Sequence, residues 1–155
     1  MMNTTFEEAK KKIYRYCAYQ ERCHREVQNK LFELGLRSAQ VDELIAHLIT
    51  EGFINEERFA KAFAGGKFRL KKWGRLKIVH ELETRGLTAT CIRIGLKEID
   101  EQEYRQTLVR LIRKKIRDTA EVNPYRLRDK VAKAVIAKGY EPDLVWKEIK
   151  VQFPG

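Results

Sequence analysis

The sequence has few of the features that indicate a secreted, disulfide-linked or membrane-spanning protein. Its 155 residues include only three cysteines, and an odd number at these spacings forms no disulfide framework, so we expect Cys17, Cys23 and Cys91 to be reduced thiols. There is no run of about 18 apolar residues that could span a membrane. Residues 1–8 lack the basic and apolar regions of a signal peptide. These absences predict a cytoplasmic protein.

The chain also lacks a recognisable catalytic or metal-binding set. Cys23 and His24 are adjacent, but neighbours on a helix point about 100° apart and cannot pair as nucleophile and base. The spacing of Cys17, Cys23 and His24 does not match a zinc site. The segment from Gly65 to Lys67 lacks the earlier glycine and the following Ser or Thr of a phosphate-binding loop. We therefore predict no enzyme activity, no cofactor and no bound metal.

Positive charge, in contrast, is abundant. The chain has 32 Lys and Arg against 22 Asp and Glu, which gives a formal net charge of +10. Residues 1–51 hold eight basic and eight acidic side chains, residues 52–98 hold eleven and five, and residues 99–155 hold thirteen and nine. The basic surface is therefore expected in the second and third parts of the chain, where it favours an acidic partner, either nucleic acid or a negatively charged protein surface.

Three glycines mark three copies of one helical unit. Gly35, Gly86 and Gly139 are 51 and 53 residues apart, and each is predicted to end a helix in the left-handed conformation. The same apolar positions surround each glycine, eight and four residues before it and one, six and ten residues after it, as on the inner faces of two successive helices. The matched sets are Val27, Ile78, Val131; Leu31, Leu82, Val135; Leu36, Leu87, Tyr140; Val41, Ile92, Val145; and Ile45, Leu96, Ile149.

This repeat predicts an all-α protein without strands. A three-helix unit of about 50 residues buries little core alone, so neighbouring units are expected to stack. We predict three tandem three-helix repeats that form an elongated, curved array in a monomer, with a basic central repeat. The predicted repeats are residues 1–51, 52–98 and 99–155, and the approximate helices are 5–18, 22–34, 38–50, 55–68, 74–85, 88–98, 101–119, 124–138 and 142–152.

A basic and aromatic stretch follows the first helix of the central repeat. The glycine pair Gly65-Gly66 predicts that this helix ends there and that helical structure resumes near Gly74. Residues 67–77 would then lie on the surface, with six basic residues, no acid and two aromatics. This stretch is either a solvated loop anchored by tryptophan or a surface that meets a polyanion. On charge alone, the candidate contacts are Lys67, Arg69, Lys71, Lys72, Trp73, Arg75 and Lys77 here, and Arg110, Arg113, Lys114, Lys115 and Arg117 in the seventh predicted helix.

The central repeat also resembles a known family. Its motif runs Gly52-Phe53-Ile54-Asn55-Glu56-Glu57-Arg58-Phe59-Ala60, then Phe63, Lys72-Trp73-Gly74, Lys77-Ile78, Glu81-Leu82 and Gly86-Leu87. Together with residues 16–27, which resemble an N-terminal motif of one bacterial lineage, it is similar to the RecX family of bacterial recombinase regulators. The resemblance covers nearly the whole chain and is strongest over residues 14–90. It implies tandem three-helix repeats and a non-enzymatic protein that binds the RecA–DNA filament and inhibits its ATPase, strand exchange and co-protease activity.

Two functions stay open on the sequence. In the first, the two basic repeats lie along the groove of a RecA–DNA filament, where they compete with incoming DNA or block subunit addition. In the second, the chain is a helical DNA-binding module such as a helix-turn-helix transcription factor, since each helix pair that turns at a glycine has that form. Residues 38–50 and 88–98, however, are not rich in base-reading Arg, Asn or Gln. A scaffold without a nucleic-acid role would leave the net charge unexplained, and the sequence does not decide between protein, DNA or both as the partner.

Overall fold

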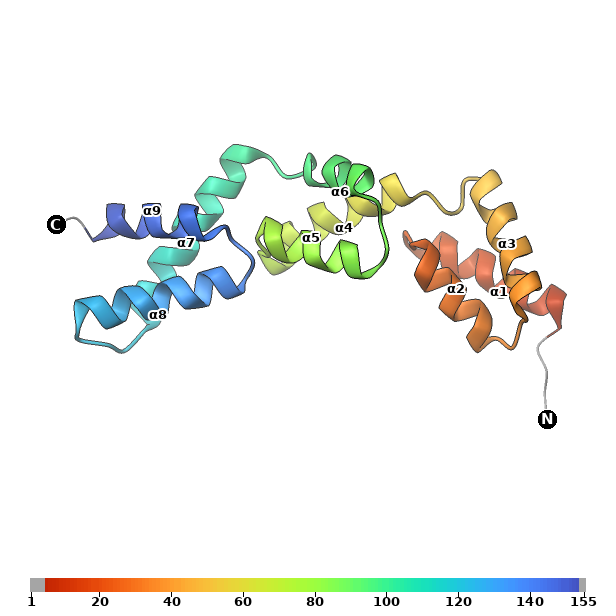
Figure 1. Cartoon of the computed structure of the whole chain (residues 1–155), viewed down its shortest axis with the longest axis horizontal. Helices are drawn as coiled ribbons and strands as arrows, with labels where there is room; N and C mark the ends of the chain where they lie inside the picture. The colour runs from red at the N-terminus through yellow and green to blue at the C-terminus, as the bar shows by residue number, and fades with distance from the viewer. Residues whose placement is uncertain (1–4, 154–155) are drawn as a thin grey trace. The chain divides into compact units, whose positions relative to one another are not determined.

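The computed structural model describes residues 5–153, and every regular element in this range is an α-helix (Figure 1). The predicted all-α fold class is therefore confirmed over the described residues. Residues 1–4, half of the segment expected to lack a signal peptide, lie outside this range. Within it, no helix has both the length and the apolar character needed to cross a membrane. The helices are α1 (Phe6–Tyr19), α2 (His24–Glu33), α3 (Ser38–Thr50), α4 (Glu56–Lys71), α5 (Arg75–Thr84), α6 (Ala89–Leu96), α7 (Glu101–Asp118), α8 (Pro124–Ala137) and α9 (Pro142–Gln152).

The glycines predicted to end helices have that role. Gly35, Gly86 and Gly139 follow α2, α5 and α8 with φ of 90°, 79° and 104°, in the left-handed region that favours glycine. After α2, the N–H of Leu36 donates to the carbonyl of Leu31 (3.2 Å), which satisfies one of the free carbonyls at the helix end. The repeat glycines therefore set where the second helix of each repeat stops.

One predicted helix end is wrong. α4 continues through Gly65-Gly66 to Lys71, and neither glycine has a positive φ. A glycine in a helix costs about 1 kcal/mol relative to alanine. That cost is offset by the burial of Phe68, which lies beyond the pair, is 4% exposed and packs on Tyr104 with ring centroids 5.8 Å apart, since burying a Phe stabilises by about 1.5–3 kcal/mol. Tertiary packing thus decides the end of α4.

Contacts divide the chain into two compact units. Unit 1 comprises the residues up to Ala62 together with Leu82–Gly95, and unit 2 comprises Phe63–Glu81 together with the residues from Leu96 onwards. The division passes through α4 and α5, so each of these helices has residues in both units. Each predicted repeat contains three of the helices, and the repeat boundaries after residues 51 and 98 stay a prediction.

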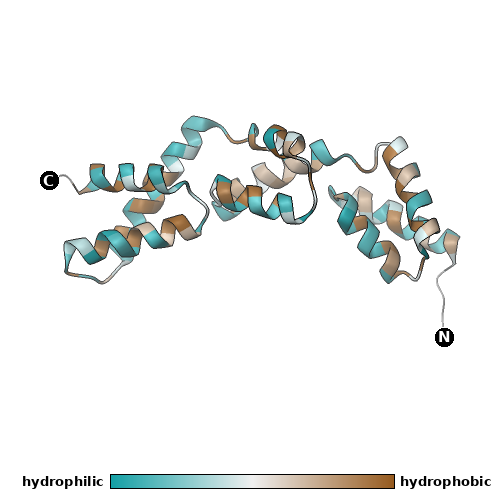
Figure 2. Ribbon diagram, viewed as in Figure 1, coloured by the Kyte–Doolittle hydropathy of each residue, from teal (hydrophilic) through white to brown (hydrophobic). Residues whose placement is uncertain are grey.

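Apolar side chains form the core of each unit. Figure 2 shows hydrophobic and hydrophilic residues alternating along the helices, as in amphipathic helices with one buried face. Burial in unit 1 raises the pKa of the Cys17 and Cys23 thiols to about 11, so both pack as small apolar side chains. In unit 1 the core includes Ala9, Ile13, Val27, Leu31, Val41, Leu44 and Leu48, each 0% exposed. In unit 2 it includes Tyr104, Leu108, Ile112, Val131, Val135, Tyr140, Val145 and Ile149, each at most 2% exposed.

A close backbone approach joins the start of α5 to the α8–α9 turn inside unit 2. The N–H of Gly74 donates to the carbonyl of Lys138 (2.8 Å), and the N–H of Leu76 donates to the carbonyl of Gly139 (2.9 Å). A Cβ at Gly74 would lie 2.3 Å from the carbonyl carbon of Gly139 and from the backbone nitrogen of Tyr140. Only glycine fits at position 74, because backbone atoms cannot move aside as a flexible side chain can.

We call this contact between the start of α5 and the α8–α9 turn the joint. We expect Gly74→Ala to destabilise the protein by about 1–3 kcal/mol or more, since the added methyl overpacks the joint. Gly66→Ala is the matched control, because a Cβ at Gly66 meets nothing within 4 Å and alanine favours a helix by about 1 kcal/mol. Urea unfolding followed by circular dichroism measures both variants. Equal stability of the two would show that the joint is not as close as described.

Candidate functional site

The turn between α4 and α5 has an unusual backbone conformation at Lys72. Its φ is 59°, and it is the one non-glycine residue with a positive φ in the part of the chain that the structure describes. Its N–H donates to the carbonyl of Phe68 (3.0 Å), and the N–H of Trp73 donates to that of Lys67 (3.3 Å). The Lys72 ammonium caps α4 through the carbonyl of Arg69 (2.8 Å). A lysine therefore occupies a position where glycine is normal, at a cost of about 1–2 kcal/mol.

Buried tyrosines hold this turn in place. The hydroxyl of Tyr140 donates to the carbonyl of Lys72 (2.9 Å), and its ring stacks on Tyr104 with centroids 5.0 Å apart. Both tyrosines are 0% exposed. Burial raises the pKa of Tyr104 and of Tyr140 far above the ordinary value, so both hydroxyls stay protonated donors. A buried hydrogen bond to the Lys72 carbonyl helps to offset the strain at that residue.

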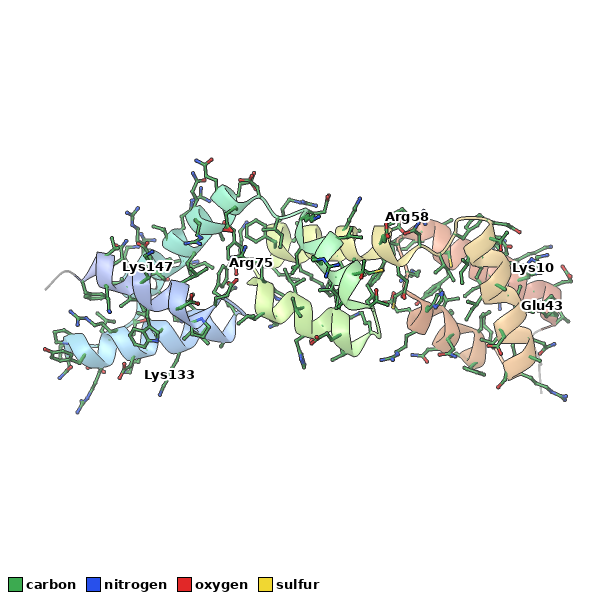
Figure 3. The ribbon with its side chains drawn as sticks, turned by 45° about the horizontal axis from the view of Figure 1, so that its top comes forward. Lys10, Glu43, Arg58, Arg75, Lys133 and Lys147 are labelled. Atoms are coloured by element: carbon green, nitrogen blue, oxygen red, sulfur yellow. The ribbon has the colours of Figure 1, made fainter. Side chains whose placement is uncertain are left out.

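Arg75, one of the residues selected from charge, is engaged inside unit 2 (Figure 3). Its Nε donates to Glu141 (2.8 Å), its Nη1 donates to Glu101 (3.1 Å), and its guanidinium lies 3.9 Å from the ring centroid of Tyr104. The Tyr104 hydroxyl accepts from the Arg75 N–H (2.9 Å) and donates to Glu141 (2.5 Å). Although burial opposes it, the hydrogen bond to Glu101 and the charge of Glu141 raise the pKa of Arg75. This guanidinium is therefore largely occupied by internal partners.

Two other lysines flank the half-buried ring of Trp73. The ammonium groups of Lys67 and Lys77 lie 5.0 Å and 4.5 Å from its centroid, within cation–π range. Phe63 packs edge-on against Trp73, with centroids 6.2 Å apart, and helps to orient the ring. Neither ammonium has a carboxylate partner among the described residues. The arrangement holds two uncompensated cations on one aromatic ring.

The last turn of α4 extends this cationic group and adds an exposed leucine. Leu70 is 83% exposed, although it lies two turns after Phe63 and so on the same helix face. Sequence reasoning missed it because periodicity predicts burial there, whereas the end of α4 buries the opposite side through Phe68. We call the following set the Trp73 surface: Lys67, Arg69, Leu70, Lys71, Lys72, Trp73 and Lys77.

The second candidate group lies further along α7. Arg110, Arg113, Lys114, Lys115 and Arg117 are all exposed. Helical spacing places four of them on one face, whereas Lys115 lies on another. The start of α7 contacts Arg75 through Glu101, and Arg110 and Arg117 follow about 13 Å and 24 Å further along the helix axis at 1.5 Å per residue. The α7 cations and the Trp73 surface are therefore two separate groups of basic residues.

An aromatic cluster that sequence reasoning missed lies at the start of α8. The guanidinium of Arg128 is 5.4 Å from the ring of Tyr125 and 5.2 Å from that of Phe153. Arg128 Nε is buried without a hydrogen-bond partner. Tyr125 is 73% exposed. Asn123 precedes Pro124, a pattern typical of a helix start, and its side chain accepts from the N–H of Tyr125 (3.0 Å). This signal could have located the ring in an exposed first turn.

We expect Arg75→Ala to lower stability by about 1–3 kcal/mol, because the partly buried Glu141 loses its charged donor and the buried ring of Tyr104 loses the guanidinium packed on it. Lys71→Ala, at an exposed position, should change stability by less than about 0.5 kcal/mol. The hydrogen bond from Arg75 lowers the pKa of Glu101, so this contact stabilises the fold at neutral pH and is lost as pH falls below the ordinary range of a glutamate. Urea unfolding should show the gap between wild type and Arg75→Ala narrowing in acid; a gap independent of pH would contradict this role.

Together these features describe an all-helical repeat protein with cationic and aromatic surfaces, and no group of three or more metal-binding side chains occurs in residues 5–153. A family model described as "RecX, second three-helix domain" matches residues 55–96. A protein of Clostridium perfringens (strain 13), named "Regulatory protein RecX", is 29% identical over 121 residues, which cover 77% of this chain and 56% of the relative. One of Bacillus cytotoxicus with the same name is 24% identical, over 92% of this chain and 54% of the relative.

Solved structures agree in fold. The crystal structure of RecX from Lactobacillus salivarius superposes with a TM-score of 0.82 at 20% identity, over 94% of this chain and 95% of that one. A second, titled "Crystal structure of regulatory protein RecX", gives 0.81 at 19% identity, over 94% and 74%. In sequence and in fold, the chain is thus similar to RecX proteins. It spans about half the length of the curated relatives that it matches.

Proposed function

We propose that this chain is a non-enzymatic regulator that binds the RecA recombinase, or the filament that RecA forms on DNA. In this role it inhibits the ATPase, strand-exchange and co-protease activities of RecA. It thereby modulates homologous recombination, DNA repair and the SOS response in the cytoplasm. The names of the relatives support a regulatory role, and one observation carries the choice of contact surface: two unpaired ammonium groups held on the ring of Trp73.

The Trp73 surface suits a protein–DNA filament because it combines charge with an apolar centre. A carboxylate or phosphate that approaches Lys67 and Lys77 meets two cations whose positions the indole already restricts, so little further ordering is needed. Trp73 offers an aromatic ring of the kind that dominates binding energy at interfaces, and the exposed Leu70 adds apolar area beside it. The surrounding cations accelerate the encounter with an acidic groove. Arg75, the one candidate between residues 67 and 77 that is not part of the Trp73 surface, has a structural role in this proposal: its internal contacts hold the surface in place.

Direct binding to DNA without a recombinase partner is the second candidate. It is favoured by the exposed cations of α7 and by the exposed ring of Tyr125 at the start of α8. Base-specific reading by α3 or α6 is not supported, because α3 carries no Lys or Arg and α6 carries only Arg93. The α7 group therefore suits contacts with the phosphate backbone rather than recognition of a sequence.

We expect the triple charge reversal Lys67→Glu, Lys71→Glu, Lys77→Glu to abolish most of the inhibition while the protein stays folded. Like charges facing an acidic groove cost several kcal/mol, so the concentration needed for half-inhibition of the RecA ATPase should rise at least about tenfold. The matched control reverses Lys133, Lys147 and Lys150, three exposed lysines of α8 and α9 in the same unit. If the first variant inhibits as well as wild type, the contact lies elsewhere. If both variants lose inhibition equally, the loss reflects the net charge of the protein and not a particular surface.

The salt dependence of binding separates the two kinds of partner. Contacts with duplex phosphates give a log–log slope of about −0.9 for each phosphate neutralised. A steep slope for naked DNA that equals the slope for the RecA–DNA filament would favour the second candidate. Binding to the filament that is much tighter than to naked DNA supports the first.

A further inference from the structure

The first repeat is electrically neutral by count, yet the structure separates its charges. Several of its acidic side chains are engaged in internal contacts. Glu21 pairs with Arg58 (2.7 Å), Glu51 accepts from the hydroxyl of Tyr14 (3.0 Å), and Glu26 caps the start of α2. The charge of a partnered carboxylate is partly neutralised locally, so the net charge of the repeat does not describe its surface.

The cations of α1, in contrast, gather on its outer face. Lys11, Lys12 and Arg15 are exposed and have no ion-pair or hydrogen-bond partner among the described residues. Tyr19, one turn after Arg15, is 81% exposed. Spacings of three and four residues place these four side chains on one face, which we call the α1 face. One carboxylate, Glu8 in the first turn, shares this side of the helix, where it complements the helix dipole.

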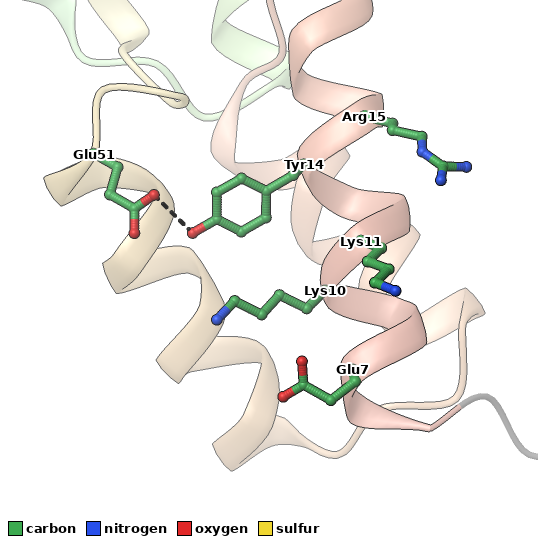
Figure 4. Close-up of a pocket in the computed structure, with 6 residues that line it drawn as sticks. All are labelled: Glu7, Lys10, Lys11, Tyr14, Arg15 and Glu51. Atoms are coloured by element: carbon green, nitrogen blue, oxygen red, sulfur yellow. Dashed lines mark hydrogen bonds between the residues drawn. The ribbon is translucent and has the colours of Figure 1, made fainter.

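Two other carboxylates, Glu7 and Glu51, lie on the side of α1 that faces α3. A shallow depression of about 470 Å³ is lined by both these carboxylates and by Lys10, Lys11, Tyr14 and Arg15. Figure 4 shows the directions in which these side chains point. Glu7 and Lys10 point toward α3, on the side of the Tyr14–Glu51 hydrogen bond. Lys11 and Arg15 project from the other side of the helix. The side chains of Lys11 and Arg15 therefore point away from Glu7 and Glu51, and the α1 face stays positively charged.

We propose that the α1 face is a binding surface for single-stranded nucleic acid, carried by unit 1 and distinct from the Trp73 surface of unit 2. Lys11, Lys12 and Arg15 contact successive phosphates, and Tyr19 stacks on an unpaired base. Single-strand binding combines a cationic track with exposed aromatic rings in this way. A duplex keeps its bases stacked inside and leaves Tyr19 unused, and an acidic protein surface would need only the cations.

Fluorescence anisotropy with a labelled oligothymidylate tests this surface in the full chain, without recombinase. Each phosphate contact on a single strand contributes a log–log salt slope of about −0.7. The triple variant Lys11→Gln, Lys12→Gln, Arg15→Gln should therefore have a slope smaller in magnitude by about 2. The matched control Arg37→Gln, Lys61→Gln, Arg93→Gln removes the same charge from exposed positions elsewhere in unit 1 and should keep the wild-type slope. Equal changes in both variants would overturn the proposal.

The stacking contact has its own test. Tyr19→Ala should weaken binding of the oligothymidylate by about five- to hundredfold, whereas Tyr19→Phe should bind as wild type does, because stacking requires only the ring. Binding of a DNA duplex should be unaffected by either change. An unaltered affinity in Tyr19→Ala, an equal loss for duplex, or full displacement of the oligothymidylate by polyglutamate would each overturn the proposal. Since no recombinase is present, failure here leaves the proposed regulation of RecA untouched.

Discussion

Two backbone hydrogen bonds, from Gly74 to Lys138 and from Leu76 to Gly139, bring the start of α5 against the α8–α9 turn. Glycine at position 74 permits that approach, and the buried Tyr140 completes it by donating to the carbonyl of Lys72. The turn at Lys72 ends α4 and orients the side chain of Trp73. The geometry of the Trp73 surface therefore depends on a joint made almost entirely of backbone and buried tyrosine.

The same joint explains why basic residues close in sequence have different roles. Arg75 is 22% exposed and shared between Glu101 and Glu141, so its charge stabilises unit 2. Lys67 and Lys77 lie against aromatic rings, both on Trp73 and Lys67 also on Phe63, and keep their charge available. A guanidinium suits the first role because it donates to two carboxylates at once, whereas an ammonium on an aromatic face keeps donors free for a partner.

Much of the fold could be predicted from periodicity and from three glycines, because these express local rules that tertiary packing reinforces. The end of α4 could not, since the burial of Phe68 against Tyr104 outweighs the cost of Gly65-Gly66, and that contact joins residues far apart in sequence. The sequence also did not predict which charged side chains are paired. Counting residues treats Arg75 and Lys71 alike and makes the first repeat neutral, although Glu51 is hydrogen-bonded to Tyr14 while Lys11 is unpaired among the described residues.

Hydrogen–deuterium exchange on the chain, alone and with RecA filaments, tests the central claim most directly, which is that the Trp73 surface is the contact with the filament. Bound partners slow exchange in the segments that they cover and stabilise. We expect peptides that span residues 67–77 to exchange more slowly with filament present, while peptides from α9 stay unchanged. Protection confined to α9, with residues 67–77 exchanging as in the free protein, would contradict the account.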